Sequence, residues 1–376
     1  MKTLYIPFTI LMLISLFGCG NDDSRSITSV AQDLPLLSSN RNLGMIVGFN
    51  ADNPVSTTDS INDRWMEALA AGMRIGRLQI DWPELEPSPG HFDENALESQ
   101  LRVLRDDSLE TFLLISAYDS EGPVVPDDLS GKKFDDPELI DRFNRLMDWV
   151  IPMLAAYDGY AISISNEADN SFDETENLSS ELLVFFNQVK GHIHSINDQM
   201  AVTVTFAEGN LAANFAGSDA LLEACDVCSF NFYGSATTGT FPFNRTLTAP
   251  EIRSDIQKML DKAGGKSIII QELGMHSGRD LLTSNEEIQR VFFEVFFSEM
   301  EKEQRLKAAY IFQLVDWSPA LSETYRSSFD QAEVPENFVD TFIESLNTIG
   351  LIQFSDGQRK AAWDEFVFWI ARFNGD

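Results

Sequence analysis

Eight short apolar segments, rich in β-branched and aromatic residues, recur along this chain and limit the folds that it can adopt. Longer segments separate them, so that successive apolar runs begin at intervals of about 38 residues. Such short, nearly continuous apolar runs are typical of parallel strands that are covered on both faces. Eight strands that alternate with helices predict an α/β fold, the (β/α)8 TIM barrel. The runs cover residues 44–49, 74–80, 111–117, 160–165, 201–206, 226–232, 267–273 and 308–314.

The segments between these runs support the same fold. Apolar residues recur with helical periodicity, and Gly72 is placed to end the first of these helices. A doubly wound sheet is the main rival, but "GFNADN" after the first run lacks the glycines of a phosphate-binding loop. We see no second domain, and we predict a single (β/α)8 catalytic domain over residues 43–376. The helical segments are 62–72, 135–157, 179–197, 285–305 and 363–376.

The charge of the chain excludes several classes of partner. It carries 59 acidic and 27 basic residues, for a formal net charge of -32, and the acidic residues are spread along its length. Nucleic acid and anionic lipid both require a basic surface, so neither is an expected partner.

The N-terminal residues predict export. Lys2, the apolar run that follows it and a small residue before Cys19 form a signal segment over residues 1–19 that is too short for a comfortable membrane span. The stretch "LFGC" resembles the lipobox of bacterial lipoproteins, which implies a lipid on Cys19; an ordinary cleaved signal peptide is the alternative. Gly20 then favours an outer-membrane anchor on the periplasmic or cell-surface side, and the polar residues 20–42 form a flexible tether. This lipid would be the chain's sole membrane contact.

Metal and cofactor chemistry is not indicated. Cys225 and Cys228 have no histidine cluster or second cysteine pair nearby to complete a zinc site, so they are either buried thiols or a local disulfide. His276, four residues past Glu272, either lines the site or makes a local hydrogen bond in a loop. We therefore predict no cofactor and no metal.

Two glutamates end predicted strands, at the edge where barrel enzymes carry their function. Asn166 and Glu167 end the fourth strand, and Glu272 ends the seventh. Three strands apart, the glutamates are expected to face each other across the barrel mouth. Paired carboxylates are what glycoside cleavage requires, because one protonates the leaving oxygen and the other stabilises or attacks the anomeric carbon.

Other residues near the strand ends suit a sugar. Trp317 would form an apolar floor for a ring, Tyr233 would donate a hydrogen bond to the nucleophile, and Asn166 would hold a ring hydroxyl. Glu208, at the end of the fifth run, either binds a hydroxyl or caps the next segment. Trp82 either packs in the core or contacts the substrate.

These motifs resemble those of the clan A glycoside hydrolases, which are retaining barrel enzymes. The resemblance implies that Glu167 is the acid/base, that Glu272 is the nucleophile and that Arg77 lies near the nucleophile. The stretch "RLQIDWPELEPSPGHFD" is similar to the second strand of several families in the clan. Ala168 stands where many members have Pro, which leaves the family within the clan open.

The sequence therefore predicts a retaining glycoside hydrolase that cleaves β-glycosidic bonds of an oligo- or polysaccharide through a glycosyl-enzyme. Two alternatives remain: a carbohydrate-binding lipoprotein without hydrolytic activity, and a transglycosylase that uses the same site. The sugar, the linkage, endo or exo action and the oligomeric state stay open.

Overall fold

The computed structural model describes seven segments of the chain, and every structural statement below refers to them. The predicted signal segment, Cys19 and most of the predicted tether lie outside the described residues. The segments are 41–46, 54–120, 122–172, 177–211, 217–238, 241–329 and 335–374.

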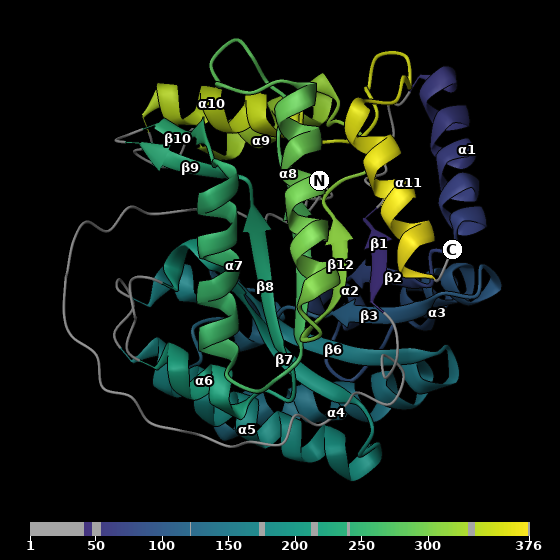
Figure 1. The fold of residues 1–376 in the computed structure, drawn as a ribbon. Helices are drawn as coiled ribbons and strands as arrows, with labels where there is room; N and C mark the ends of the chain where they lie inside the picture. The colour runs from purple at the N-terminus through teal and green to yellow at the C-terminus, as the bar shows by residue number, and fades with distance from the viewer. Residues whose placement is uncertain are drawn as a thin grey trace. The chain divides into compact units, whose positions relative to one another are not determined.

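Eight strands form one sheet with the order β1-β12-β11-β8-β7-β6-β3-β2, as labelled in part in Figure 1. The pairs β1–β12, β2–β3, β3–β6, β6–β7 and β7–β8 are all parallel. Every one of these strands overlaps one of the eight predicted runs, and the (β/α)8 barrel is confirmed. The strands are β1 (Asn42–Met45), β2 (Ile75–Gln79), β3 (Glu110–Leu114), β6 (Gly159–Asn166), β7 (Ala201–Ala207), β8 (Cys228–Tyr233), β11 (Ile268–Gly274) and β12 (Leu306–Ile311).

Helices follow each of these strands along the chain. Four short strands that the sequence did not predict lie in the connections: β4 (Tyr118–Asp119), β5 (Gly122–Pro123), β9 (Ser235–Thr238) and β10 (Phe241–Thr246). The helices are α1 (Val55–Ala71), α2 (Trp82–Leu85), α3 (Glu94–Asp106), α4 (Pro137–Ala156), α5 (Leu178–Ile196), α6 (Ser218–Ala224), α7 (Ala249–Ala263), α8 (Glu286–Lys302), α9 (Pro319–Ser328), α10 (Glu336–Leu346) and α11 (Ala361–Phe373).

The chain divides into two compact units, which we describe separately. Among the described residues, unit 1 comprises 75–231 and 258–271, and unit 2 comprises the rest. Strands β8 and β11 therefore begin in unit 1 and end in unit 2. The prediction of one catalytic domain over residues 43–376 stays a prediction.

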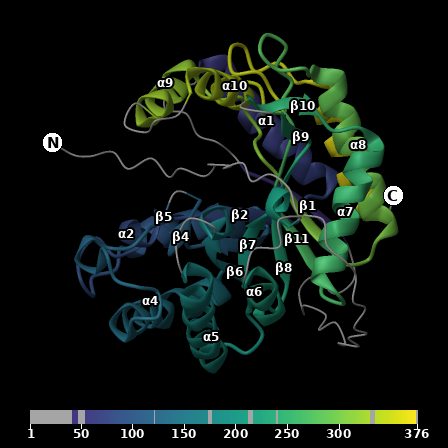
Figure 2. The ribbon, with the colours of Figure 1, turned by 90° about the vertical axis from the view of Figure 1, so that its left-hand side faces the viewer.

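In unit 1, α4 and α5 lie side by side (Figures 1 and 2). Asp136 caps α4 by accepting a hydrogen bond from the backbone N–H of Glu138 at 2.8 Å. The apolar face of α4 is buried, and the ring of Phe143 lies edge-on to Phe185, with 5.1 Å between centroids. This periodic burial is why the sequence pattern located the helix to within two residues.

In unit 2, α8 packs against α11 (Figure 1). Asn285 caps α8 through its side chain, which accepts from the N–H of Ile288 at 3.0 Å. The helix α1 ends as predicted at Gly72, which adopts a left-handed conformation with φ of 107°. It begins at Val55, earlier than the apolar pattern indicated, because polar residues make up its first turns.

Three further findings bear on the predictions about metal, membrane and thiols. Among the described residues, no group of three or more His, Cys, Asp or Glu side chains is arranged to hold a metal ion. No helix there is long and apolar enough to cross a membrane. Cys225 and Cys228 are buried free thiols, and burial raises the pKa of Cys228 to about 12. They are therefore packing residues, one of the two predicted alternatives.

Candidate active site

The fourth barrel strand, β6, delivers Glu167 to the edge of the sheet. All eight residues of β6 are buried, and the strand ends at Asn166. Glu167 then adopts φ of 48°, a left-handed conformation that is uncommon for residues other than glycine. Its backbone N–H donates to the carbonyl of Thr205 at 2.7 Å, so the turn is tied to the neighbouring strand.

Both carboxylate oxygens of Glu167 accept hydrogen bonds from amide side chains. Asn231, on β8, donates to Oε1 at 2.8 Å, and Asn170 donates to Oε2 at 3.2 Å. The Glu167 side chain is held from two sides, and the residue is 3% exposed. Hydrogen bonds to a charged acceptor are stronger than neutral ones, so this arrangement favours one orientation of the carboxylate.

Asn166 lies in the same buried group of amides. It donates to Asp119 Oδ1 at 3.1 Å and accepts from Gln271 Nε2 at 2.9 Å and from Asn231 Nδ2 at 3.2 Å. The carbonyl of Asn166 is therefore used inside the protein. Its predicted role in holding a substrate hydroxyl stays a prediction.

Hydroxyl groups lie beneath these amides, in an interior that the sequence analysis expected to be apolar. Thr205 contacts Ser163 at 3.1 Å and Ser229 at 2.9 Å through their hydroxyl oxygens, and it donates to Gln271 Oε1 at 2.8 Å. All four residues are buried. The signal for Ser163 and Thr205 was the alternation of Ser or Thr with apolar residues in the fourth and fifth runs.

Two carboxyl groups of unit 1 have pKa values that are raised to about 7. Burial, together with the nearby charges of Asp119 and Glu84, raises the pKa of Asp81 to about 7. Burial also raises the pKa of Asp169 to about 7, against the hydrogen bonds that it accepts, one of them from the N–H of Ala207. Neither Asp119 nor Asp169 was predicted from the sequence.

In unit 2, Tyr233 donates a hydrogen bond to Glu272 Oε2 at 2.5 Å, which confirms the predicted contact. Glu272 lies near the end of β11 and is fully buried. The ring of Phe312 packs edge-on against Tyr233, with 6.0 Å between centroids. Gly274 permits this packing, because a Cβ there would lie 2.7 Å from the Tyr233 ring. Phe312, an aromatic residue within the eighth run, was not predicted from the sequence.

Trp317 lies in the segment that follows β12. Its ring packs edge-on against Tyr325 at 4.5 Å, and the residue is 8% exposed. The indole N–H is buried and has no hydrogen-bond partner among the described residues. The face of the ring is therefore partly used for packing, and the predicted role as a sugar floor stays a prediction.

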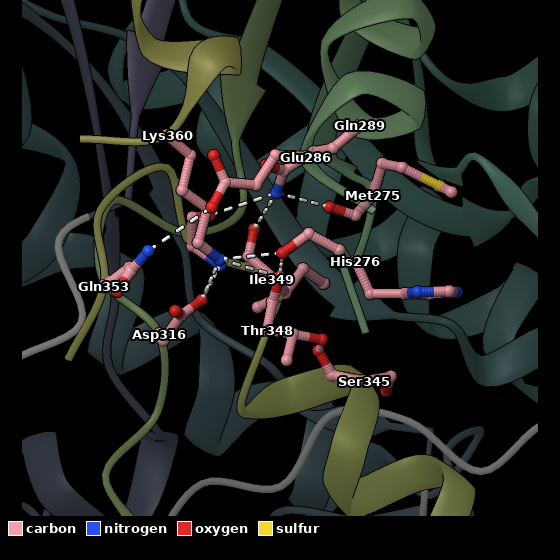
Figure 3. Close-up of polar contacts among 12 residues, drawn as sticks. Met275, His276, Glu286, Gln289, Asp316, Ser345, Thr348, Ile349, Gln353 and Lys360 are labelled. Carbon is pink, nitrogen blue, oxygen red and sulfur yellow. Dashed lines mark hydrogen bonds and ion pairs between the residues drawn. The ribbon is translucent and has the colours of Figure 1, made fainter. Parts of the chain in front are cut away.

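A buried ion pair stabilises this segment, as Figure 3 shows. The ammonium of Lys360 contacts Asp316 Oδ1 at 2.6 Å and donates to Ser277 Oγ at 3.1 Å and to the carbonyl of Thr348 at 3.0 Å. Burial raises the pKa of Asp316 to about 6, against the lowering effect of Lys360. Three loops of unit 2 thus meet at one side chain.

Gln289, on α8, ties the same loops together. Its Nε2 lies within hydrogen-bond distance of the carbonyl oxygens of Met275 at 2.8 Å, Ile349 at 3.2 Å and Gly350 at 3.0 Å (Figure 3). Met275 directly follows β11, so the strand that carries Glu272 is anchored just beyond its end.

The remaining predicted residues lie as follows. Arg77 is buried in β2 and donates a hydrogen bond to the side chain of Gln79 at 2.9 Å. Arg77 belongs to unit 1 and Glu272 to unit 2, so the predicted proximity of these two residues stays a prediction. Glu208 begins a short 3-10 helix and is partly buried. Trp82 is fully buried against Phe143 and donates its indole N–H to Glu86. Of its two predicted roles, Trp82 therefore has the one in core packing.

Comparison with known proteins gives no match by sequence, either to a family model or to a curated protein. Solved structures do match. A GH5_18 protein from Bifidobacterium longum, in complex with Manb1-4GlcNAc, has a TM-score of 0.66 and 12% identity over 89% of this chain and 79% of that chain. A GH5_18 protein from Streptomyces cattleya, also in complex with Manb1-4GlcNAc, has a TM-score of 0.64 and 13% identity over 90% and 82% of the two chains.

An exo-beta-1,4-mannosidase from Opitutaceae bacterium strain TAV5 is similar as well. Its TM-score is 0.62, with 16% identity over 89% of this chain and 60% of that chain. Structural similarity at this level of sequence identity shows a common fold. It does not show a common function, because one fold can carry many different active sites. The chain has the (β/α)8 barrel fold of these glycoside hydrolases.

Proposed function

We propose that this protein is a retaining β-glycoside hydrolase in which Glu167 is the acid/base and Glu272 is the nucleophile. The hydrogen bond from Tyr233 to Glu272 is the observation that carries the proposal. A phenol that donates to a buried strand-end carboxylate stabilises its ionised form and directs one oxygen, as a nucleophile requires.

The proposed reaction has two steps. Glu272 attacks the anomeric carbon while Glu167 gives its proton to the departing glycosidic oxygen, and a covalent glycosyl-enzyme forms. Glu167 then takes a proton from water, which attacks the same carbon and releases Glu272. The amide donors Asn231 and Asn170 stabilise the carboxylate that Glu167 becomes after it gives up its proton.

β-Mannosides are the first substrates to test. Two structurally similar proteins were solved in complex with Manb1-4GlcNAc, and a third is named an exo-beta-1,4-mannosidase. We extend this only to the class of substrate, a β-linked oligo- or polysaccharide.

Incubation of the purified protein with aryl β-mannosides and a panel of other aryl β-glycosides tests the proposal. Release of the aryl group, with a first-formed sugar that keeps the β configuration by NMR, is the expected result. Binding without release would replace this function with the carbohydrate-binding alternative. Transfer to an added sugar acceptor in preference to water would identify a transglycosylase.

We also propose that the protein is exported and lipidated on Cys19, which is based on the N-terminal sequence alone. Metabolic labelling with a palmitate analogue should label the full-length protein and should fail to label Cys19→Ala. Labelling of both forms, or of neither, would contradict the lipid anchor.

A further inference from the structure

A directed chain of hydrogen bonds runs through the interior of unit 1 to Glu167. Thr205 donates to Gln271 Oε1 at 2.8 Å, and Gln271 Nε2 donates to Asn166 Oδ1 at 2.9 Å and to Asn231 Oδ1 at 3.4 Å. Asn231 Nδ2 then donates to Glu167 Oε1 at 2.8 Å. None of these five residues is more than 3% exposed.

The direction of this chain follows from the chemistry of its groups. A side-chain amide has a donating end and an accepting end, and a hydroxyl has a single proton to give. Because Thr205 donates to the carbonyl of Gln271, the amino group of Gln271 faces the carbonyls of Asn166 and Asn231. The carbonyl of Asn231 is thereby occupied, and its amino group is directed at the Glu167 carboxylate.

We propose that Gln271 is a positioning residue for the acid/base step, and that it acts by orienting the Asn231 amide toward Glu167. This inference rests on the proposed function, because it assigns Gln271 a task only if Glu167 transfers a proton. It also explains why a polar side chain occupies a fully buried position directly before Glu272, where an apolar residue would fill the interior without needing partners.

Loss of Gln271 has a specific consequence. The Asn231 amide would lose the donor that occupies its carbonyl and would be held only by its contact with Asn166 at 3.2 Å, so the charge-assisted hydrogen bond that stabilises the Glu167 carboxylate would weaken. The protonated form of Glu167 would then persist to higher pH. The alkaline limb of the kcat/KM profile should move upward by about one pH unit.

The test compares Gln271→Met with the unaltered protein on two aryl β-glycosides. A phenyl glycoside has a poor leaving group that needs a proton, whereas a dinitrophenyl glycoside leaves without one. We expect kcat/KM to fall about 10- to 100-fold on the phenyl glycoside and by no more than about threefold on the dinitrophenyl glycoside. The alkaline limb should move upward.

Thr205→Val provides a second variant if Gln271→Met does not fold. It removes the hydroxyl that orients Gln271 and should move the alkaline limb in the same direction by a smaller amount. Thr111→Val is the matched control: Thr111 is also a buried strand threonine, and its hydroxyl has no hydrogen-bond partner among the described residues. Its pH profile should not change.

An equal loss on both glycosides with an unmoved alkaline limb would overturn the inference, since Gln271 would then be only structural. A shift in Thr111→Val as large as that in Thr205→Val would overturn it as well. Lack of glycosidase activity in the unaltered protein would overturn the proposed function, and the inference with it. Measuring the unaltered protein first separates these two failures.

Discussion

At the scale of single residues, the two proposed catalytic carboxylates differ in their hydrogen-bond partners. Glu167 accepts from two neutral amides, whereas Glu272 accepts from a phenol. Such different surroundings are how proteins assign different tasks to chemically identical groups. The sequence predicted the phenol at Tyr233, because Tyr233 stands at the end of the sixth predicted strand. It did not predict either amide partner of Glu167.

Glu167→Gln should lower kcat/KM on a phenyl β-glycoside by about 10² to 10⁴-fold, because the leaving oxygen loses its proton donor. The loss on a dinitrophenyl glycoside should be much smaller. Initial rates over a range of pH measure both effects. Glu223→Gln, on an exposed residue of α6, is the control and should leave activity unchanged. Similar losses on both glycosides would remove Glu167 from the acid/base role.

Tyr233→Phe should reduce kcat/KM about 10- to 100-fold, because the Glu272 carboxylate loses the hydrogen bond that the Tyr233 hydroxyl donates to it. The ring itself keeps its packing against Phe312. Steady-state kinetics and a melting curve test this. Tyr157→Phe is a matched control, since Tyr157 also donates to a glutamate, Glu98, at 2.6 Å but on α4's C-terminal end. It should leave activity unchanged; full activity in Tyr233→Phe would contradict the nucleophile assignment.

At the scale of elements, close packing at strand ends determines which residues are tolerated. Gly274 ends β11 against the Tyr233 ring, and its backbone carbonyl accepts from the N–H of Gly234 at 2.9 Å. The sequence located these strands from their apolar runs, because burial on both faces selects such residues. It did not reveal the close approach at Gly274, which depends on a side chain 41 positions earlier in the chain.

Gly274→Ala should reduce both stability and activity, because the added Cβ would lie 2.7 Å from the Tyr233 ring and 2.9 Å from the Phe312 carbonyl. A cost of about 1–3 kcal/mol in unfolding free energy is expected from denaturant titration. Gly191→Ala makes the same change within α5, where the added Cβ would meet no atom within 4 Å beyond the backbone of its own helix. It should stabilise the protein by about 0.5–1 kcal/mol. Equal effects at both positions would contradict the packing argument.

Asp169→Asn should change how stability depends on pH. Burial raises the pKa of Asp169 from 3.8 to about 7 in the folded protein, so the folded state holds a proton between these values that the unfolded state has lost. The stability that this group contributes is present below pH 4 and is lost as the pH rises through 7. Asp169→Asn keeps an acceptor for the N–H of Ala207 but cannot ionise.

The variant should therefore gain unfolding free energy relative to the unaltered protein between pH 4 and pH 8, by about 4 kcal/mol. Denaturant titrations at both pH values measure the gain. Asp141→Asn, on an exposed residue of α4, is the control and should show no such gain. A difference that shrinks as pH rises would contradict the assignment.

At the scale of the whole molecule, the sheet order and the strand–helix alternation define the barrel, and the net charge of -32 limits what it can bind. Long-range repulsion disfavours polyanionic partners, including acidic polysaccharides. Neutral β-linked sugars are consistent with this charge.

A retaining mechanism also requires a particular distance between the carboxyl groups of the acid/base and the nucleophile. The carboxyl groups of Glu167 and Glu272 should lie about 5 Å apart in a crystal structure of the complete protein, because the nucleophile must reach the carbon whose leaving group the acid protonates. A separation beyond about 9 Å would contradict retention. The configuration of the released sugar, followed by NMR, is an independent measurement of the same point.

The sequence by itself determined the eight strands, the main helices and the glutamates at strand ends, because burial and helix capping depend on residues close together in the chain. It also indicated Tyr233 as the partner of Glu272. Only the tertiary structure decided that Ser, Thr, Gln and Asn side chains fill the interior beneath Glu167, and that Trp82 is a core residue. The contact from Gln271 to Asn166 joins side chains 105 positions apart. Local periodicity carries no information about such a contact, since hydrogen bonds between strands depend on which strand ends the closed fold brings together.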